Sequence, residues 1–269
     1  MRIIDAQIHL WAGGWAPSHH WRAPYTVETA LRDMDEAGVD RAVNCPAIWD
    51  AAANDYAVEA AVRHPDRFAT LGWFPLDASA DESLVDTWLA KPGMLGLRFV
   101  LMEPGIGDRL ASGALDWLWD AAHQRDMPVG LMVLPEHLPL IGDIAARHPR
   151  MRVLMDHLAI SPFDTQQDAS ARIDALLTLA RRPNIAVKAT AVPALATDDY
   201  PFAGTHELLR RVYDAYGAHR MFWGTDITRL RCTWAQCVRM FTEELPWLRG
   251  HDLELVMGGG LADWIDWPR

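Results

Sequence analysis

The sequence has little of several features that would assign it quickly to a class. It holds three cysteines among 269 residues, Cys45, Cys232 and Cys237, and their spacing matches neither a zinc ribbon nor a disulfide framework. Positive charge is also scarce, with 25 Lys and Arg against 36 Asp and Glu and a formal net charge of −11. That balance disfavours nucleic acid and anionic membranes as partners. The sparse cysteines are typical of a reducing, cytoplasmic location.

Long apolar runs and nucleotide-binding signatures are missing too. No segment approaches the roughly 18 apolar residues of a membrane span, and polar residues interrupt the N-terminal MRIIDAQIHLW, unlike a signal peptide. The sequence contains no G-x-G-x-x-G after its first apolar run, no G-x-x-x-x-G-K phosphate loop and no G-x-S-x-G serine elbow. Dinucleotide binding, P-loop chemistry and serine-hydrolase chemistry are therefore not expected.

What the sequence does contain is a regular alternation of short apolar runs with longer segments of helical period. Within Thr26–Ala37, for example, Val27, Ala30 and Met34 fall on one face of a helix. Half of all residues are hydrophobic, so a large core can be buried. Eight strand–helix pairs can be counted. The predicted strands are Arg2–Leu10, Arg41–Ala47, Phe68–Phe74, Met94–Leu101, Pro128–Leu134, Arg152–Leu158, Ile185–Thr190 and Met221–Asp226.

Strict alternation predicts a parallel sheet with right-handed crossovers, since parallel neighbours need a long connection to return along the sheet. Eight units can close into a TIM barrel, a fold that often uses about 250 residues. We therefore predict an α/β fold, a slightly elaborated (β/α)8 barrel that forms a single domain over residues 1–269; a doubly wound open sheet is the alternative. Other predicted helices are Asn54–Arg63, His137–Arg147, Ala169–Ala180 and Leu253–Trp267.

Three polar residues interrupt the first predicted strand. With the period of two of a strand, Asp5, Gln7 and His9 share one face, while Ile4 and Ile8 lie on the other. Polar groups that face a packed barrel interior cost roughly several kcal/mol unless they find partners. We therefore expect a metal, water or other polar side chains beside them, the last arrangement being a hydrogen-bonded plug of the barrel.

Two later strands also end in polar residues. His157 follows the apolar run of the sixth predicted strand, and Asp226 follows that of the eighth. Taken alone, His157 indicates a core or capping histidine, and Asp226 indicates the cap of a turn. However, the first strand delivers His9 to the same C-terminal end, where barrel enzymes hold their catalytic residues. We predict that these three side chains meet around one reacting centre.

The segment Ala12–Pro24, after the first strand, is the least regular part of the sequence. In a barrel it becomes a loop over the mouth of the active site. His19, His20, Trp21 and Arg22 are therefore expected either to line the substrate pocket or to belong to a solvated loop. The C-terminal helix is expected to pack against the barrel or against a second subunit, and the latter would make the protein a homo-oligomer.

Two cations interrupt apolar strands. Arg98 lies in the fourth predicted strand and Lys188 in the seventh, and buried cations need anionic partners. One interpretation is a structural ion pair with Asp5 or Asp156. The other is that Arg98 binds a substrate carboxylate through two hydrogen bonds and Lys188 lies near a developing oxyanion. Arg229, just after the eighth strand, is a further substrate-binding candidate.

Several motifs, in their order and spacing, resemble the amidohydrolase superfamily. The resemblance covers nearly the whole chain and is carried by IIDAQIHLW, PDRF, GLRFV, VLMDHLA, NIAVKATA and FWGTDI. It is specifically to the amidohydrolase-related branch, which contains sugar lactonases, pyrone-dicarboxylate lactonase and aromatic-acid decarboxylases. The resemblance implies the metal-dependent hydrolase fold, a slightly elaborated barrel.

In that family two opening histidines, the sixth-strand histidine and the eighth-strand aspartate surround a divalent metal. This sequence departs from the pattern, because Gln7 stands in place of the first histidine and Met132 where many members have a fifth-strand histidine. An amide oxygen is a weaker zinc ligand than imidazole. Two versions of the site therefore stay open, one with no metal and one with a single divalent metal, preferably zinc. The implied ligands are Gln7, His9, His157 and Asp226.

The resemblance favours a hydrolase that opens a small lactone bearing a carboxylate, with Asp226 as the general base. One alternative is a nonoxidative decarboxylase of an aromatic or unsaturated acid that uses the same residues. Another is a catalytically silent barrel that binds an anion, which the departures at Gln7 and Met132 would fit. In the leading hypothesis, the catalytic residues are Asp226, His157 and His9, and the residues that bind the anionic substrate are Arg98, Lys188, His20 and Arg229.

Overall fold

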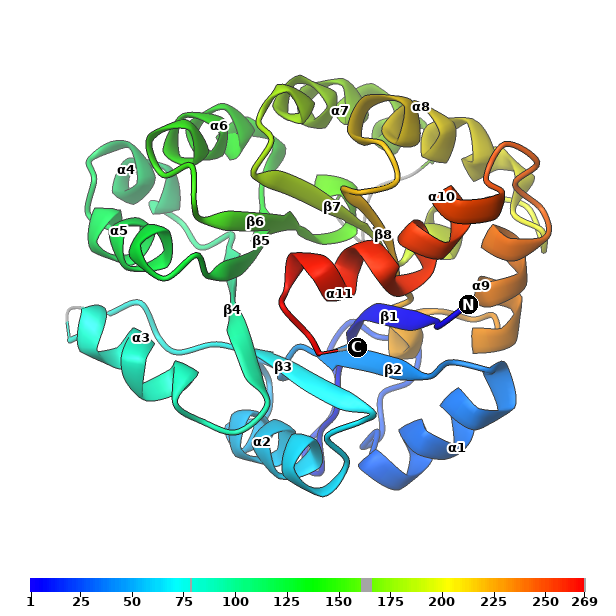
Figure 1. Ribbon diagram of the computed structural model, residues 1–269, viewed down its shortest axis with the longest axis horizontal. Helices are drawn as coiled ribbons and strands as arrows, with labels where there is room; N and C mark the ends of the chain where they lie inside the picture. Colours follow the sequence, from blue (N-terminus) through cyan, green and yellow to red (C-terminus); the bar gives the residue numbers. More distant parts are fainter. Residues whose placement is uncertain (78, 161–165, 269) are drawn as a thin grey trace.

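The computed structural model contains eight parallel strands arranged in a ring, with helices on the outside (Figure 1). It describes residues 1–77, 79–160 and 166–268. Hydrogen-bonded neighbours follow the order of the chain, which confirms the predicted (β/α)8 barrel. The strands are β1 (Ile4–Ile8), β2 (Arg41–Asn44), β3 (Phe68–Gly72), β4 (Met94–Leu101), β5 (Pro128–Val133), β6 (Arg152–Met155), β7 (Ile185–Ala189) and β8 (Met221–Trp223).

Helices follow the strands because apolar residues recur with helical period, and side chains cap the first turn of α1, α3 and α9. Thr26 caps the first helix by accepting a hydrogen bond from Thr29, and Gly38 ends it with a φ of 73°. No described helix is long and apolar enough to cross a bilayer. The α-helices are α1 (Val27–Ala37), α2 (Ala53–Arg63), α3 (Glu82–Leu89), α4 (Ile106–Ala111), α5 (Asp116–Gln124), α6 (Leu138–Arg147), α7 (Gln166–Thr178), α8 (His206–Tyr216), α9 (Trp234–Thr242), α10 (Gly250–Glu254) and α11 (Gly260–Trp264).

Hydrogen bonds between the loop after β8 and strand β1 close the ring. The Asp226 amide donates to the Gln7 carbonyl oxygen at 2.9 Å. The buried Asp5 carboxylate accepts from the Thr225 amide at 2.9 Å and from the Thr225 hydroxyl at 2.5 Å. Burial raises the pKa of Asp5 to about 7. The two hydrogen bonds from Thr225 to Asp5 link β1 to the residues just after β8.

The prediction that Asp5 shares a face with Gln7 and His9 is wrong. The pairing of β1 with β2 shifts register between Asp5 and Ile8, so the alternation of sides is interrupted within the strand. Ile4 packs in the apolar interior of the barrel instead. The Asp5 side chain accepts hydrogen bonds from Thr225, just after β8. Gln7 of β1 and His9, just after the strand, reach the charged part of the barrel.

An apolar cluster fills the N-terminal end of the barrel, where α11 crosses it (Figure 1). Leu261 of α11 packs there with Ile4 of β1 and Phe222 of β8. The predicted helix Leu253–Trp267 is interrupted, because a π-helical segment over Leu255–Gly259 separates α10 from α11. The C-terminal segment therefore packs against the barrel, which was one of the two expected arrangements.

Every strand except β4 ends earlier than predicted, and two of them, β6 and β8, are followed by left-handed turns. Strand β6 ends at Met155, and β8 ends at Trp223. Beyond them the backbone is left-handed at His157, with a φ of 51°, and at Asp226, with a φ of 52°. This conformation costs residues other than glycine about 1–2 kcal/mol, and such strain gathers at functional sites. The two residues picked out by sequence thus lie in turns rather than in strands.

Candidate active site

The structure brings His9, His157 and Asp226 together at the C-terminal end of the barrel. The Nε2 atom of His9 lies 3.4 Å from Oδ1 of Asp226, and Nε2 of His157 lies 3.7 Å from Oδ2. All three residues are buried. They follow β1, β6 and β8, which are far apart in the chain and end on the same side of the ring, with β7 between β6 and β8. The predicted convergence of these side chains is therefore present in the fold.

Hydrogen bonds fix the orientation of both imidazoles. Nδ1 of His9 donates to the Cys45 carbonyl oxygen at 2.5 Å, which leaves the Nε2 lone pair facing Asp226. Nδ1 of His157 lies 2.7 Å from the Thr190 hydroxyl. Burial lowers the pKa of His9 and lowers that of His157 to about 4. Both rings are thus neutral at pH 7, the form in which imidazole binds a metal or accepts a proton.

Asp226 is an ionised carboxylate with one unshared oxygen. Burial opposes its charge, but the positive charges of His9, protonated at low pH, and of Arg229 outweigh burial and hold the pKa of Asp226 well below its usual range. Nε of Arg229 donates to Oδ2 at 2.9 Å. Oδ1 has no hydrogen-bond partner among the described residues. An open, buried carboxylate oxygen is suited to receive a metal, a water molecule or a substrate group.

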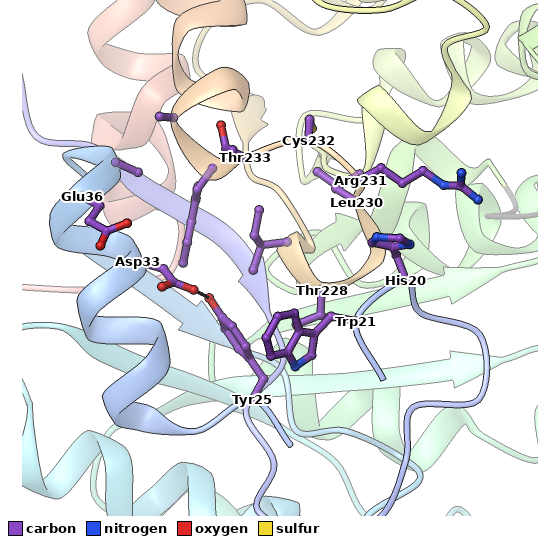
Figure 2. Close-up of a pocket in the computed structure, with 14 residues that line it drawn as sticks. His20, Trp21, Tyr25, Asp33, Glu36, Thr228, Leu230, Arg231, Cys232 and Thr233 are labelled. Carbon is purple, nitrogen blue, oxygen red and sulfur yellow. Dashed lines mark hydrogen bonds between the residues drawn. The ribbon is translucent and has the colours of Figure 1, made fainter. Parts of the chain in front are cut away.

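The loop after β1 adds a histidine to this cluster, and it is His19 rather than His20. His19 is buried, and its Nδ1 lies 2.8 Å from the Thr228 hydroxyl, while Nε2 accepts from Arg229 at 3.1 Å. Burial lowers the pKa of His19 to about 3. His20 is exposed and lines a separate outer pocket (Figure 2). Neighbouring residues in an irregular loop carry no periodic signal, so the sequence could not distinguish them.

Three side chains have the arrangement of a metal site. Ligand atoms of His9, His19 and Asp226 all lie within 4.8 Å of one another, and neutral imidazoles with a carboxylate are ligands that zinc accepts. Gln7 has other contacts, because its oxygen accepts from Lys188 at 3.0 Å and its amide nitrogen lies 3.3 Å from Nε2 of His157. These bonds direct the Gln7 amide to its neighbours, which differs from the expected ligand role.

A second buried cluster is centred on Asp156. Lys188 Nζ lies 2.9 Å from one carboxylate oxygen, and Arg98 Nε donates to the other at 2.7 Å. Burial opposes the charge of Asp156, but Lys188 and Arg98 hold its pKa below the usual range. A Cβ atom at Gly130 would lie 3.0 Å from Cγ of Arg98 and 3.6 Å from Nζ of Lys188. The predicted ion pair therefore forms with Asp156, not Asp5, and Gly130 leaves room for it.

The charges of the two clusters do not balance. Arg98, Lys188 and Arg229 are three cations, whereas Asp156 and Asp226 are two ionised carboxylates. The described groups thus leave one positive charge in a largely buried site, where an unbalanced charge is costly. The outer nitrogen Nη2 of Arg98 lies 3.9 Å from the sulfur of Met132, and no described carboxylate pairs with it. An anionic ligand would balance the excess charge.

An aromatic side chain packs against His9 and His19, two of the possible metal ligands. The Trp49 ring makes edge contacts with His19 at 4.8 Å and with His9 at 5.6 Å between ring centres. It also packs edge-on against Trp11 at 5.4 Å. Trp49 therefore packs against both imidazoles. Thr190 and Thr228 carry no signal in the sequence, because only the fold brings their hydroxyls next to His157 and His19.

Comparison with known proteins gives the family. The family model described as amidohydrolase matches residues 4–255. The chain belongs to the amidohydrolase family. At 26% identity over 232 residues, it is similar to L-fucono-1,5-lactonase of Burkholderia ambifaria, with 83% of this chain and 79% of the relative covered. The family predicted from the motifs is thus confirmed, and this amidohydrolase is an enzyme of the hydrolase class.

Solved structures share the fold of this amidohydrolase. An amidohydrolase from Burkholderia multivorans with bound zinc has a TM-score of 0.84 at 18% identity, with 100% of each chain covered. The probable 2-pyrone-4,6-dicarboxylic acid hydrolase of Acinetobacter baumannii, with citric acid bound, has a TM-score of 0.77 at 16% identity over 99% of this chain and 100% of that chain. At these identities the likeness establishes the fold.

Proposed function

We propose that this amidohydrolase hydrolyses the ring C–O bond of a small lactone that carries a carboxylate. The observation that carries the proposal is the pairing of an open, ionised Asp226 oxygen with neutral His9 and His157, next to a cluster with an excess positive charge. The similarity to a lactonase supports the reaction class. The unbalanced cation favours an anionic substrate over a neutral one.

In this mechanism Asp226 is the general base. Its Oδ1 accepts a proton from a water molecule that attacks the lactone carbonyl, Nε2 of His9 accepts the other hydrogen of that water, and His157 borders the same carboxylate on its Oδ2 side. A positioned base contributes about 10²–10⁴-fold to the rate. Carbonyl attack places negative charge on the carbonyl oxygen, and the ring oxygen leaves as the alcohol after taking up the proton that Asp226 received from water.

The Asp156 cluster binds the substrate in this proposal. Arg98 uses its outer guanidinium nitrogens for the substrate carboxylate, because Asp156 occupies only Nε among the contacts described. Lys188 lies on the other side of Asp156 and stabilises the developing oxyanion. Arg229, held by Asp226 and His19, contributes further positive charge at the mouth.

The residues also fit a divalent metal, preferably zinc. His9, His19 and Asp226 would hold it, since their ligand atoms are close together and Oδ1 of Asp226 is open. Such an ion would polarise the lactone carbonyl. Arg229 already binds both Asp226 and His19, so its guanidinium competes with the metal for the same two side chains.

A matched substrate panel tests the function. Purified protein, with and without added zinc, is incubated with lactones that bear a carboxylate, with the same lactones bearing a neutral amide, and with neutral sugar lactones. Acid release is followed by titration and carbon dioxide by a coupled assay. We expect acid release without carbon dioxide, and at least about tenfold higher kcat/KM for the carboxylates.

Three other outcomes would contradict parts of the proposal. Carbon dioxide from aromatic or unsaturated acids, with every lactone inert, would establish the decarboxylase alternative. Equal kcat/KM for charged and neutral lactones would contradict the anionic substrate but not the hydrolysis. Tight binding of the anions with no product over hours would establish a silent binding barrel.

A further inference from the structure

Two of the three cysteines lie in contact outside the proposed active site. Sγ of Cys232 is 3.5 Å from Sγ of Cys237. Cys237 belongs to α9, and Cys232 immediately precedes Thr233, whose side chain caps that helix. The Trp223 indole donates to the Cys237 carbonyl oxygen at 3.3 Å, which anchors this turn of α9 to β8. The sulfurs need to approach by only about 1.5 Å to reach the disulfide bond length of about 2.05 Å.

The two thiols differ in access. Cys232 is partly exposed. It lines a pocket of about 490 Å³ between α1 and the segment that follows β8, and Trp21 and Leu230 also line this pocket (Figure 2). Cys237 is only 2% exposed. A small oxidant can therefore reach the first sulfur directly, while the second sulfur is reached from the first.

The two thiols also differ in acidity. The hydrogen bond from the Cys237 thiol lowers the pKa of Cys232, and the same contact, together with burial, raises the pKa of Cys237. Cys232 also lies next to the N-terminus of the nine-residue helix α9, where a negative charge is favoured. Cys45, inside the barrel, has its pKa raised by burial. Cys232 is thus the reactive nucleophile of the three.

We propose that Cys232 and Cys237 form a peroxide-reactive pair that closes to an intramolecular disulfide. The Cys232 thiolate attacks hydrogen peroxide, the O–O bond breaks, and the sulfur takes one oxygen to become a sulfenic acid while hydroxide leaves and is protonated. The Cys237 sulfur then attacks the sulfenic sulfur. The S–S bond forms, the S–O bond breaks, and the oxygen leaves as water with the Cys237 proton. Overall, two thiols and one peroxide give one disulfide and two waters.

Peptide mapping after limited oxidation tests the pair directly. The reduced full-length protein is treated with stoichiometric hydrogen peroxide, unfolded, alkylated and digested with trypsin, which places both thiols in the single peptide Cys232–Arg239. We expect this peptide to lose two hydrogens and to resist alkylation, while Cys45 in the same sample remains alkylated. Cys232 should react at least about tenfold faster than Cys45.

Two variants identify the roles of the sulfurs. In Cys237→Ser, we expect dimedone to trap a sulfenic acid at Cys232, because the second sulfur is missing. In Cys232→Ser, we expect no dimedone adduct at Cys237. Circular dichroism on both variants shows whether each is folded. No internal disulfide in the wild-type protein, or oxidation of Cys232 no faster than that of Cys45, would overturn the proposal.

Discussion

The two ends of the barrel are built from the same strands but hold opposite kinds of side chain. The interior changes from Leu154 on β6 to the buried Asp156, just after that strand, and on β7 from Ala186 to the buried Lys188, each two residues further along. The N-terminal end is apolar and is covered by α11. One step of the strand period therefore separates a layer that stabilises the fold from a layer that holds charge in place.

This difference has an energetic consequence. Apolar burial at the N-terminal end contributes about 25 cal/mol for each Å² removed from water. At the C-terminal end, Asp156 and its two cations instead carry a desolvation cost that their mutual attraction must offset. Charges held in a largely buried site at such cost are expected to be there for chemistry, and the variants below test each end separately.

The largest stability effect is expected for Asp156→Ala. The change leaves Arg98 and Lys188 buried without their shared carboxylate, and removal of one member of a buried ion pair costs about 3–5 kcal/mol. Urea unfolding measures the loss. Asp86→Ala, which breaks an exposed pair with Arg125, is the matched control, with an expected loss of about 0–1 kcal/mol. Equal losses in the two variants would contradict the contrast between buried and exposed pairs.

A smaller loss is expected for Leu261→Ala at the apolar end. Leu261 is buried against Ile4 and Phe222, and truncation of a buried leucine costs about 2–4 kcal/mol. Because Leu261 packs at the opposite end of the barrel from Asp156 and Asp226, kcat on the substrate found in the panel should be unchanged. Urea unfolding and steady-state kinetics on the same preparation check both expectations. A fall in kcat in a fully folded variant would show that the two ends are coupled.

The next effect concerns the competition between Arg229 and a metal. In Arg229→Ala, Asp226 and His19 lose their shared cation, so zinc affinity should rise about tenfold, which is about 1.4 kcal/mol. Isothermal titration of zinc into the metal-free protein measures the change. Arg229→Lys keeps the charge and should bind zinc like the wild type. Unchanged or weaker zinc binding in Arg229→Ala would argue against His9, His19 and Asp226 as the ligands.

The smallest effect is expected for Thr190→Val. The hydroxyl lost in this variant contacts Nδ1 of His157, so the ring should sample other orientations, at a cost of about 1 kcal/mol or roughly fivefold in kcat. KM should change little, because Thr190 does not contact the substrate in the proposed mechanism. Thr190→Ser retains the hydroxyl and should restore kcat. Failure of serine to rescue would point to a packing role.

Much of the fold could be predicted because its signals are local. Each strand is a short apolar run bounded by turn residues, and Met94–Leu101 was predicted with both ends correct. The meeting of His9, His157 and Asp226 followed from topology, since a closed parallel barrel brings the C-terminal ends of its strands together. The family prediction rested on the order of several motifs, and the family match confirmed it.

The missed details depend on contacts that are distant in sequence. The register shift after Asp5 reflects bonds to Thr225, 220 residues away. The contacts of Gln7 are set by Lys188 and His157, which no local pattern places beside it. The choice of His19 over His20 depends on the path of a loop. The sequence thus predicts the strands and helices, but it does not predict which side chains contact one another.

The most direct test of the account is kcat for Asp226→Asn on the lactone that the panel identifies. The amide has nearly the shape of the carboxylate but cannot accept the proton of water, so we predict a fall in kcat of about 10²–10⁴-fold. The left-handed turn at Asp226 tolerates asparagine, so the circular dichroism spectrum should be unchanged. A folded Asp226→Asn protein with undiminished kcat would contradict the mechanism.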